Sequence, residues 1–271
     1  MLIAFTLIGA VLLVIWAFAR LNTYKPTIKR VRLTVNHPMK HGLNILHLSD
    51  LHMEKLSISP TALLNRLRQE PIDLIALTGD YLDTEPMRDR FLQYIKTLSS
   101  LKPRYGMYAV FGNHDYVIEP LLPELRKEMK NLGCTVLQNE NCSIKIGEQW
   151  LNIIGIDDYF TGRSDLPRSF ANLKPGINLV LTHDPNIVLE MKDYPFDYLL
   201  SGHFHGGQIH WPKPYHLRKM GRLPHQNIFR GLHYHNNRAF YISEGLGQTA
   251  FRMRLRSRPE ITFHNIGGFD V

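Results

Sequence analysis

The sequence predicts a layered α/β fold preceded by an N-terminal membrane anchor helix. Three observations support this prediction. An uncharged apolar stretch opens the chain, short apolar runs typical of buried strands recur after it, and amphipathic stretches typical of helices separate several of these runs. With 271 residues, 44% of them hydrophobic, the chain can bury one substantial core. We expect an anchor over residues 1–23 and one domain over residues 24–271.

The apolar stretch runs from Leu2 to Ala19 without a charged residue, and its 18 residues are close to the lower limit of about 17 for crossing a bilayer. Trp16 lies near its end, as an interfacial anchor does. Only Met1 precedes the stretch and no clear Ala-x-Ala cleavage site follows it, so we interpret it as an uncleaved anchor and not as a signal peptide. A buried N-terminal helix is the alternative.

Cationic residues follow the anchor with no acidic residue among them, and such flanks are retained on the cytoplasmic side of a membrane. They are Arg20, Lys25, Lys29, Arg30 and Arg32. We therefore expect the globular part in the cytoplasm.

The cysteines, Cys134 and Cys142, lack metal-type spacing and are expected to be free thiols. A net charge of +8 indicates an anionic partner but does not distinguish lipid headgroups from nucleic acid or a phosphorylated small molecule.

Seven short apolar runs are the expected strands. In chain order they are Leu43–Leu48, Leu74–Leu77, Met107–Phe111, Leu151–Ile156, Ile177–Leu181, Tyr198–Leu200 and Ala239–Ile242. Amphipathic helices are expected at Pro60–Gln69, Arg88–Leu98 and Leu121–Leu132. In such a layered fold, catalytic residues lie on the loops that leave the strand ends.

Five of these runs are followed directly by side chains that can bind a metal ion. They are Asp50 and His52, Asp80, Asn113 to Asp115, His183 and Asp184, and His203 and His205. Oxygen and nitrogen donors of this kind suit divalent transition metals. A single Asp-x-His is more typical of a turn with a surface histidine, but five such groups at successive strand ends indicate a metal centre.

In order and type, these motifs resemble the full motif series of the calcineurin-like metallophosphoesterases, and the anchor makes the chain similar to their bacterial, membrane-anchored, single-domain subgroup. The resemblance covers about Asn44 to Glu244 and implies a layered β-sandwich flanked by helices. It also implies two divalent ions, of which Mn²⁺ is our first expectation and iron or zinc the alternatives. The implied ligands are Asp50, His52 and His205 for one ion, Asn113, His183 and His203 for the other, and Asp80 as the bridge between them.

Two adjacent ions would activate a water molecule and hold the phosphoryl oxygens for in-line attack. The resemblance implies that His114 is not a ligand but faces the substrate, where it protonates the leaving oxygen or stabilises transition-state charge. Asp83 resembles the family aspartate that orients this histidine. Asp115 is a less favoured orienting residue, and a solvated turn carboxylate is the alternative interpretation of Asp83.

The sequence departs from the family pattern at two positions near the site. Phe204 stands where a small hydroxyl residue is usual between the two histidines, and His210 stands where arginine is common. Neither departure removes a ligand.

Two later segments are candidates for substrate binding. Residues 209–238 are rich in aromatic and basic residues, including Trp211, and should overhang the site and meet lipid headgroups or a lipid-linked pyrophosphate, although a solvated loop is the alternative. Further on, arginines alternate with apolar residues, so in a strand their guanidinium groups would form one row that binds phosphate; a basic edge that prevents aggregation is the alternative. The four arginines are Arg252, Arg254, Arg256 and Arg258. We take Arg252, Arg254 and Trp211 as candidate substrate-binding residues.

The sequence thus predicts a metal-dependent phosphoric ester or anhydride hydrolase at the bacterial inner membrane. Its expected partners are the lipid bilayer and a phosphorylated, lipid-linked substrate, with no obligate protein partner; the resemblance makes UDP-diacylglucosamine one specific candidate. A phosphodiesterase for soluble substrates or a nuclease is the alternative, with nucleic acid less favoured. From another class, a non-catalytic, metal-stabilised membrane binding module would be expected to lack a ligand or His114, and the sequence retains them all.

Overall fold

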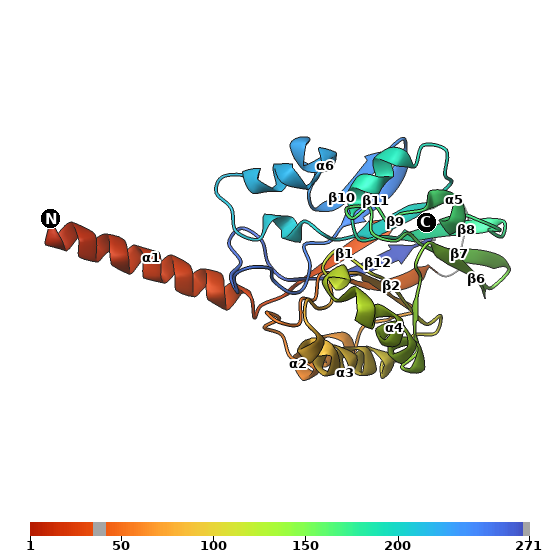
Figure 1. Cartoon of the computed structure of the whole chain (residues 1–271), viewed down its shortest axis with the longest axis horizontal. Helices are drawn as coiled ribbons and strands as arrows, with labels where there is room; N and C mark the ends of the chain where they lie inside the picture. The colour runs from red at the N-terminus through yellow and green to blue at the C-terminus, as the bar shows by residue number, and fades with distance from the viewer. Residues whose placement is uncertain (35–41, 268–271) are drawn as a thin grey trace.

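The computed structural model describes residues 1–34 and 42–267, and these residues form two six-stranded β-sheets and the helices around them. The sheets pack face to face, helices cover their outer faces, and one long N-terminal helix projects away from the layers (Figure 1). Two sheets that each bury both faces require such a four-layer arrangement. The layered α/β sandwich expected from the sequence is confirmed.

The first sheet has the strand order β1-β12-β2-β3-β4-β5. Its strands are β1 (Thr27–Leu33), β12 (Glu260–Ile266), β2 (Leu43–Leu48), β3 (Leu74–Thr78), β4 (Met107–Val110) and β5 (Cys134–Val136). Neighbouring strands from β2 to β5 are parallel, whereas β12 is antiparallel to β2. The carboxyl ends of β2, β3 and β4 therefore lie side by side at one edge of the sheet.

The second sheet has the strand order β10-β11-β9-β8-β7-β6. Its strands are β10 (Gly231–His235), β11 (Arg238–Ile242), β9 (Tyr198–Ser201), β8 (Gly176–Leu181), β7 (Gln149–Gly155) and β6 (Glu140–Ile146). The four central strands are parallel, and antiparallel pairing with β10 and β6 closes the two edges. The carboxyl ends of β8 and β9 are consequently neighbours too.

One hydrophobic core lies between the sheets, where Ile45 and Leu74 of the first sheet belong to the same buried cluster as Ile153, Leu179 and Leu200 of the second. On the outside, α2 (Pro60–Leu67), α3 (Arg88–Ser99) and α4 (Leu122–Asn131) cover the first sheet, and α5 (Leu166–Ser169) and α6 (Arg222–His225) lie over the second (Figure 1). Short 3-10 helices connect these layers. They are η1 (Glu85–Met87), η2 (Asp115–Leu121), η3 (Pro185–Glu190), η4 (His205–Gly207) and η5 (Tyr215–Met220).

Helix α1 (Leu2–Asn22) contains the apolar stretch that is the candidate anchor. It is long and apolar enough to cross a membrane by length and composition, with a mean hydropathy of 2.7, and only 6% of its apolar window is buried. The alternative of a buried core helix is therefore wrong. At its end Ala19 and Asn22 are buried against the domain, while the first turns extend into open space (Figure 1).

Each of the seven apolar runs corresponds to a strand, although Phe111 and Ile156 lie one residue beyond the ends of β4 and β7; β1, β5, β6, β10 and β12 were not predicted. β12 was missed because buried polar side chains interrupt its apolar pattern. These side chains have hydrogen-bond partners: Thr262 donates to Glu260, and Tyr198 contacts His264. The segment with the four arginines is not a strand; within it, only Leu255 and Arg256 form isolated bridges to Ile209. The conditional expectation of a row of guanidinium groups along one face is therefore wrong.

Candidate metal centre

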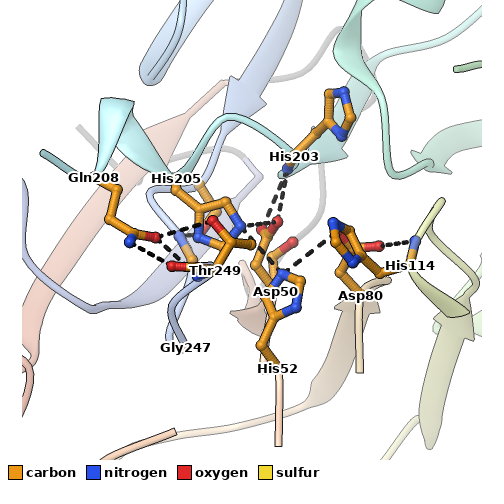
Figure 2. Close-up of polar contacts among 12 residues, drawn as sticks. Asp50, His52, Asp80, His114, His203, His205, Gln208, Gly247 and Thr249 are labelled. Atoms are coloured by element: carbon orange, nitrogen blue, oxygen red, sulfur yellow. Dashed lines mark hydrogen bonds and ion pairs between the residues drawn. The ribbon is translucent and has the colours of Figure 1, made fainter. Parts of the chain in front are cut away.

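The polar motifs leave the carboxyl ends of β2, β3 and β4 in the first sheet and of β8 and β9 in the second. Contacts between these loops bring the two sheets' motifs together. The backbone N–H of His203 donates to the carboxylate of Asp50, and that of His114 donates to Asp80 (Figure 2). The site therefore lies where the ends of the two sheets meet, as expected for residues placed on strand-end loops.

One group of donors combines Asp50, His52, Asp80 and His205, whose ligand atoms all lie within 4.8 Å of one another. Nε2 of His205 is 3.3 Å from Oδ1 of Asp50 and 3.2 Å from Nε2 of His52. All four residues are buried. Two imidazole nitrogens and two carboxylates that converge in this way fit one divalent cation.

A second group combines Asp80, His183 and His203 within the same limit. Nε2 of His183 is 3.1 Å from Oδ2 of Asp80 and 3.1 Å from Nδ1 of His203. Nδ1 of His183 lies 2.7 Å from the carbonyl of Thr78; if it donates there, Nε2 remains free for a cation. Oδ1 of Asn113 is buried without a hydrogen-bond partner in the described part of the chain, which suits a further ligand to this ion.

Asp80 belongs to both groups, and its Oδ2 lies 3.5 Å from Nε2 of His52 and 3.1 Å from Nε2 of His183. Burial raises its pKa, but the charge of His183 and the hydrogen bonds with His183 and His52 outweigh burial and hold the pKa well below its ordinary value. Burial lowers the pKa of His203 to about 3, and burial together with the charges of His52 and Arg254 holds that of His205 well below its ordinary value. Burial also lowers the pKa of His52 and of His183, but their pairing with Asp80 outweighs burial and raises the pKa of His52 to about 10 and that of His183 well above its ordinary value. Neutral imidazole is the form that binds metal, so these two histidines would lose a proton when a cation binds.

The backbone around the site is strained. Five residues here adopt the left-handed region, which residues other than glycine rarely enter. Their φ angles are 52° at Asp50, 41° at His52, 57° at Asp80, 78° at His203 and 49° at His205. Each of them is a candidate ligand. Backbone strain of this kind costs about 1–3 kcal/mol per residue and concentrates at functional sites.

Close packing around Asp50 explains the need for one glycine. A Cβ on Gly202 would lie 1.9 Å from Oγ of Ser49 and 2.2 Å from Oδ2 of Asp50, so no larger residue fits without displacing the carboxylate.

His114 lies beside the two donor groups, with a side chain that is 34% exposed. Its Nδ1 is 3.1 Å from Oδ1 of Asp83, which is also 3.5 Å from Nδ1 of His52. Burial lowers the pKa of His114, but the pairing with Asp83 and the charge of Asp80 outweigh burial and raise it. Burial raises the pKa of Asp83, whereas its pairings with His114 and His52 outweigh this effect and lower it.

Asp115 accepts hydrogen bonds from the backbone N–H groups of Gly112, Asp80 and Tyr81. The carboxylate thus holds the two ligand-bearing turns together, and it is Asp83 that faces His114. Asp83, for which a solvated turn carboxylate is the alternative interpretation, lies beside His114 with a side chain that is 27% exposed.

A pocket of about 150 Å³ opens above the two donor groups, and Asp80, Asn113, His114, His203 and His205 form its floor. Other residues complete its wall. They are Phe204, Gly207, Gln208, His216, Leu217, Met220 and Thr249. Three of these belong to residues 209–238, so part of that segment does border the site. Gln208 carried no recognisable pattern in the sequence; it is placed by its side-chain hydrogen bonds to the backbone of Thr249 and Phe251 (Figure 2).

The three candidate substrate-binding residues occupy different environments. Trp211 is 76% exposed, and the guanidinium carbon of Arg256 lies 4.7 Å from the centre of its ring. Arg252 is exposed and donates to the carbonyl of Glu54. Arg254, in contrast, is fully buried, and its guanidinium donates to backbone carbonyls and to Ser257. The structure therefore does not place these three side chains in one substrate-binding surface.

Comparison with known proteins agrees with this geometry. Residues 43–207 match the family model of calcineurin-like phosphoesterases. The chain is 56% identical over 230 residues to the uncharacterized metallophosphoesterase YkoQ of Bacillus subtilis, covering 84% of this chain and 85% of that protein. It is 34% identical to the phosphodiesterase YaeI of Escherichia coli, covering 80% of each chain. It is 27% identical to the UDP-2,3-diacylglucosamine pyrophosphatase LpxG of Chlamydia trachomatis, covering 91% of each chain. The chain belongs to the calcineurin-like phosphoesterase family and is a metal-dependent phosphoester hydrolase.

Proposed function

We propose that this chain is a binuclear phosphodiesterase or pyrophosphatase that acts at the surface of the bacterial inner membrane on a phosphorylated, lipid-linked substrate. The observation that carries the proposal is the pair of buried donor groups that share Asp80 at the floor of one pocket. In this proposal residues 1–23 are the anchor and the domain lies in the cytoplasm. Mn²⁺ is the first candidate for both ions, because the mixed nitrogen and oxygen donors suit it.

The reaction assigns separate tasks to the side chains. When bound, two divalent ions supply water activation and neutralise charge on the phosphoryl oxygens. Asp50, His52 and His205 would hold one ion, and Asn113, His183 and His203 the other, with Asp80 shared between them.

His114 borders the same pocket without belonging to either of the two donor groups that share Asp80. With Nδ1 turned toward Asp83, its Nε2 is the nitrogen that can give a proton to the leaving oxygen. A negative Asp83 favours the imidazolium form of His114, which is the form that this task needs.

Features outside the pocket support action at a membrane. Helix α1 exposes nearly all of its apolar residues, and its base lies against the segment around Arg252 and Arg254. The same segment includes Phe251, which is 64% exposed, and follows Thr249 of the pocket wall. Exposed aromatic and cationic residues such as Trp211 and Arg256 suit an anionic interface. The choice of a lipid-linked pyrophosphate is supported by the similarity to LpxG, a UDP-2,3-diacylglucosamine pyrophosphatase.

The test uses the full chain in detergent, stripped with chelator and reloaded with Mn²⁺. Hydrolysis of UDP-2,3-diacylglucosamine is compared with that of the matching UDP-sugar without acyl chains and with bis-p-nitrophenyl phosphate. We expect metal-dependent turnover with a strong preference for the acylated substrate. Equal turnover of both UDP-sugars would overturn the lipid assignment and favour the soluble-substrate phosphodiesterase. Two bound ions without turnover of any substrate would favour the non-catalytic module.

A nuclease, the remaining alternative, is tested with single-stranded and double-stranded oligonucleotides at two salt concentrations. Cleavage of nucleic acid that falls steeply with salt would favour the nuclease, because contacts to phosphates are weakened by counterions. We expect the lipid substrate to be hydrolysed faster in vesicles than in their absence, with a smaller response to salt.

A further inference from the structure

Arg254 is a buried cation whose guanidinium binds the backbone. The residue is fully buried, and Nη1 donates to the carbonyls of His205 at 2.9 Å and of Glu244 at 2.7 Å. Nη2 donates to the carbonyls of Gly245 at 3.1 Å and of Gly247. A guanidinium offers five donors in a fixed plane, so one side chain satisfies four carbonyls from two separate segments.

These carbonyls belong to the segments that carry or support two candidate ligands of the same ion. His205 is itself a ligand in the group with Asp50 and His52. The turn at Gly245 and Gly247 lies directly against Asp50: the N–H of Gly247 donates to the Asp50 carbonyl at 2.7 Å, and a Cβ on Gly245 would lie 2.7 Å from Cβ of Asp50. Arg254 thus fixes the spacing between the backbone of His205 and that of Asp50.

The ligands of the second ion are connected to Arg254 indirectly, through the N–H of His203 that donates to Asp50. In the described part of the chain, no hydrogen bond of Arg254 reaches Asn113, His183 or His203. His183 is oriented instead by the Thr78 carbonyl. A change at Arg254 should therefore affect the two metal positions unequally.

The main chain of Arg254 contacts the base of helix α1. Its N–H donates to the carbonyl of Ala19 at 2.9 Å, and its carbonyl accepts from Nδ2 of Asn22 at 3.0 Å. The last carbonyls of a helix lack partners within the helix, so the bond to Ala19 is a cap made by a distant part of the chain, and the bond from the Asn22 side chain is a second contact beside it. The same residue therefore binds the anchor helix through its backbone and the metal-holding loops through its side chain.

We infer that Arg254 is a positioning residue for the metal position formed by Asp50, His52 and His205, and that it couples this position to the base of α1. The inference rests on the proposed function only in requiring that the two donor groups bind metal. Lysine cannot replace the arginine, because a single ammonium has three donors and no planar arrangement that reaches both segments.

The experiment titrates Mn²⁺ into the chelator-stripped, full-length chain in detergent by calorimetry, with Arg258→Lys as the matched control. Arg258 is exposed and donates to the carbonyl of Lys25 beyond α1, so the control makes the same chemical change without touching the site loops. We expect two binding events in the unsubstituted chain and in the control. In Arg254→Lys, one event should weaken by about 10-fold or more while the other stays within twofold.

Two further variants identify the position affected. Arg254→Lys added to a His205→Ala chain should not weaken the remaining ion further, because both changes act on the same position. Asn22→Ala, which removes only the bond from α1, should weaken that same event by a smaller factor. Equal weakening of both events, or of neither in a chain that circular dichroism shows to be folded, would overturn the inference.

Ser257→Ala keeps the inference testable if Arg254→Lys does not fold. The Ser257 hydroxyl accepts from Nη1 of Arg254 at 3.1 Å, so its loss should weaken the same event more mildly, and an unchanged titration would count against the role of Arg254. The readout is metal binding and not turnover. If one binding event weakens in the titration but the lipid substrate is not hydrolysed, the result therefore contradicts only the proposed substrate.

Discussion

Replacing His114 with alanine tests the assignment of the proton donor. The side chain lies outside the two donor groups that share Asp80, and its backbone N–H, which donates to Asp80 at 2.9 Å, stays in place in His114→Ala. The two metal positions should therefore remain occupied. General acid catalysis contributes about 10²–10⁴-fold, so we expect kcat to fall at least about 10²-fold, equivalent to about 2.7 kcal/mol of transition-state stabilisation.

The assay compares leaving groups, because protonation matters only where the leaving oxygen is basic. We expect the full loss for a phosphodiester with an alkyl leaving group and a much smaller loss for bis-p-nitrophenyl phosphate, whose leaving group departs readily as an anion. His225→Ala, on the exposed surface of α6, is the control. Loss of bound metal in His114→Ala, or an equal fall with both leaving groups, would refute the assignment.

Four other changes have defined outcomes. Asp80→Ala should remove both ions in metal analysis and abolish turnover, because both donor groups lose their shared carboxylate. Asp83→Asn should lower the raised pKa of His114; since the acid form is lost as pH rises through this pKa, the alkaline limb of the kcat/KM profile should move to lower pH. Gly202→Ala should destabilise the chain by about 1–3 kcal/mol in denaturant unfolding, because its Cβ would overlap the Ser49 side chain. Chelation should lower the thermal midpoint by about 5–11 °C for each ion that is otherwise present at 100 times its Kd; an unchanged midpoint would show that the ions do not stabilise the fold.

Much of the fold was predictable because the central strands are apolar on both faces. Sheet strands such as β3 and β8 are buried along nearly their whole length, so their sequences are short continuous apolar runs. The edge strands were missed because one face meets solvent or polar neighbours. β6, for example, is only partly buried, and β1 exposes Lys29 and Arg30. Such strands are recognised by their partners in the sheet and not by a pattern of their own.

The candidate ligands were predictable since their types and order along the chain match a family motif series, and the structure brings Asp50, Asp80 and His205 together from separate strand ends. The pocket wall was not, because residues such as Gln208 and Thr249 are brought to the site by bonds between distant loops. Arg254 was placed in the wrong environment for a related reason. Alternation of arginine with apolar residues predicts an exposed row of guanidinium groups only if the backbone is extended. Here the backbone bends and lies along two other loops, with isolated bridges in place of a strand.

Burying acidic side chains at the meeting point of two sheets costs free energy that this chain offsets in two ways. Asp115 accepts backbone N–H bonds, whereas Asp50 and Asp80 face imidazole nitrogens in geometries that fit cations. Strained backbone at these ligands, with φ between 41° and 78°, adds a further cost that the surrounding structure must offset. Metal binding and the clamp of Arg254 on the His205 loop are therefore expected to act together: the arginine holds the ligand backbone in its strained form, and the ion compensates the buried charge that results.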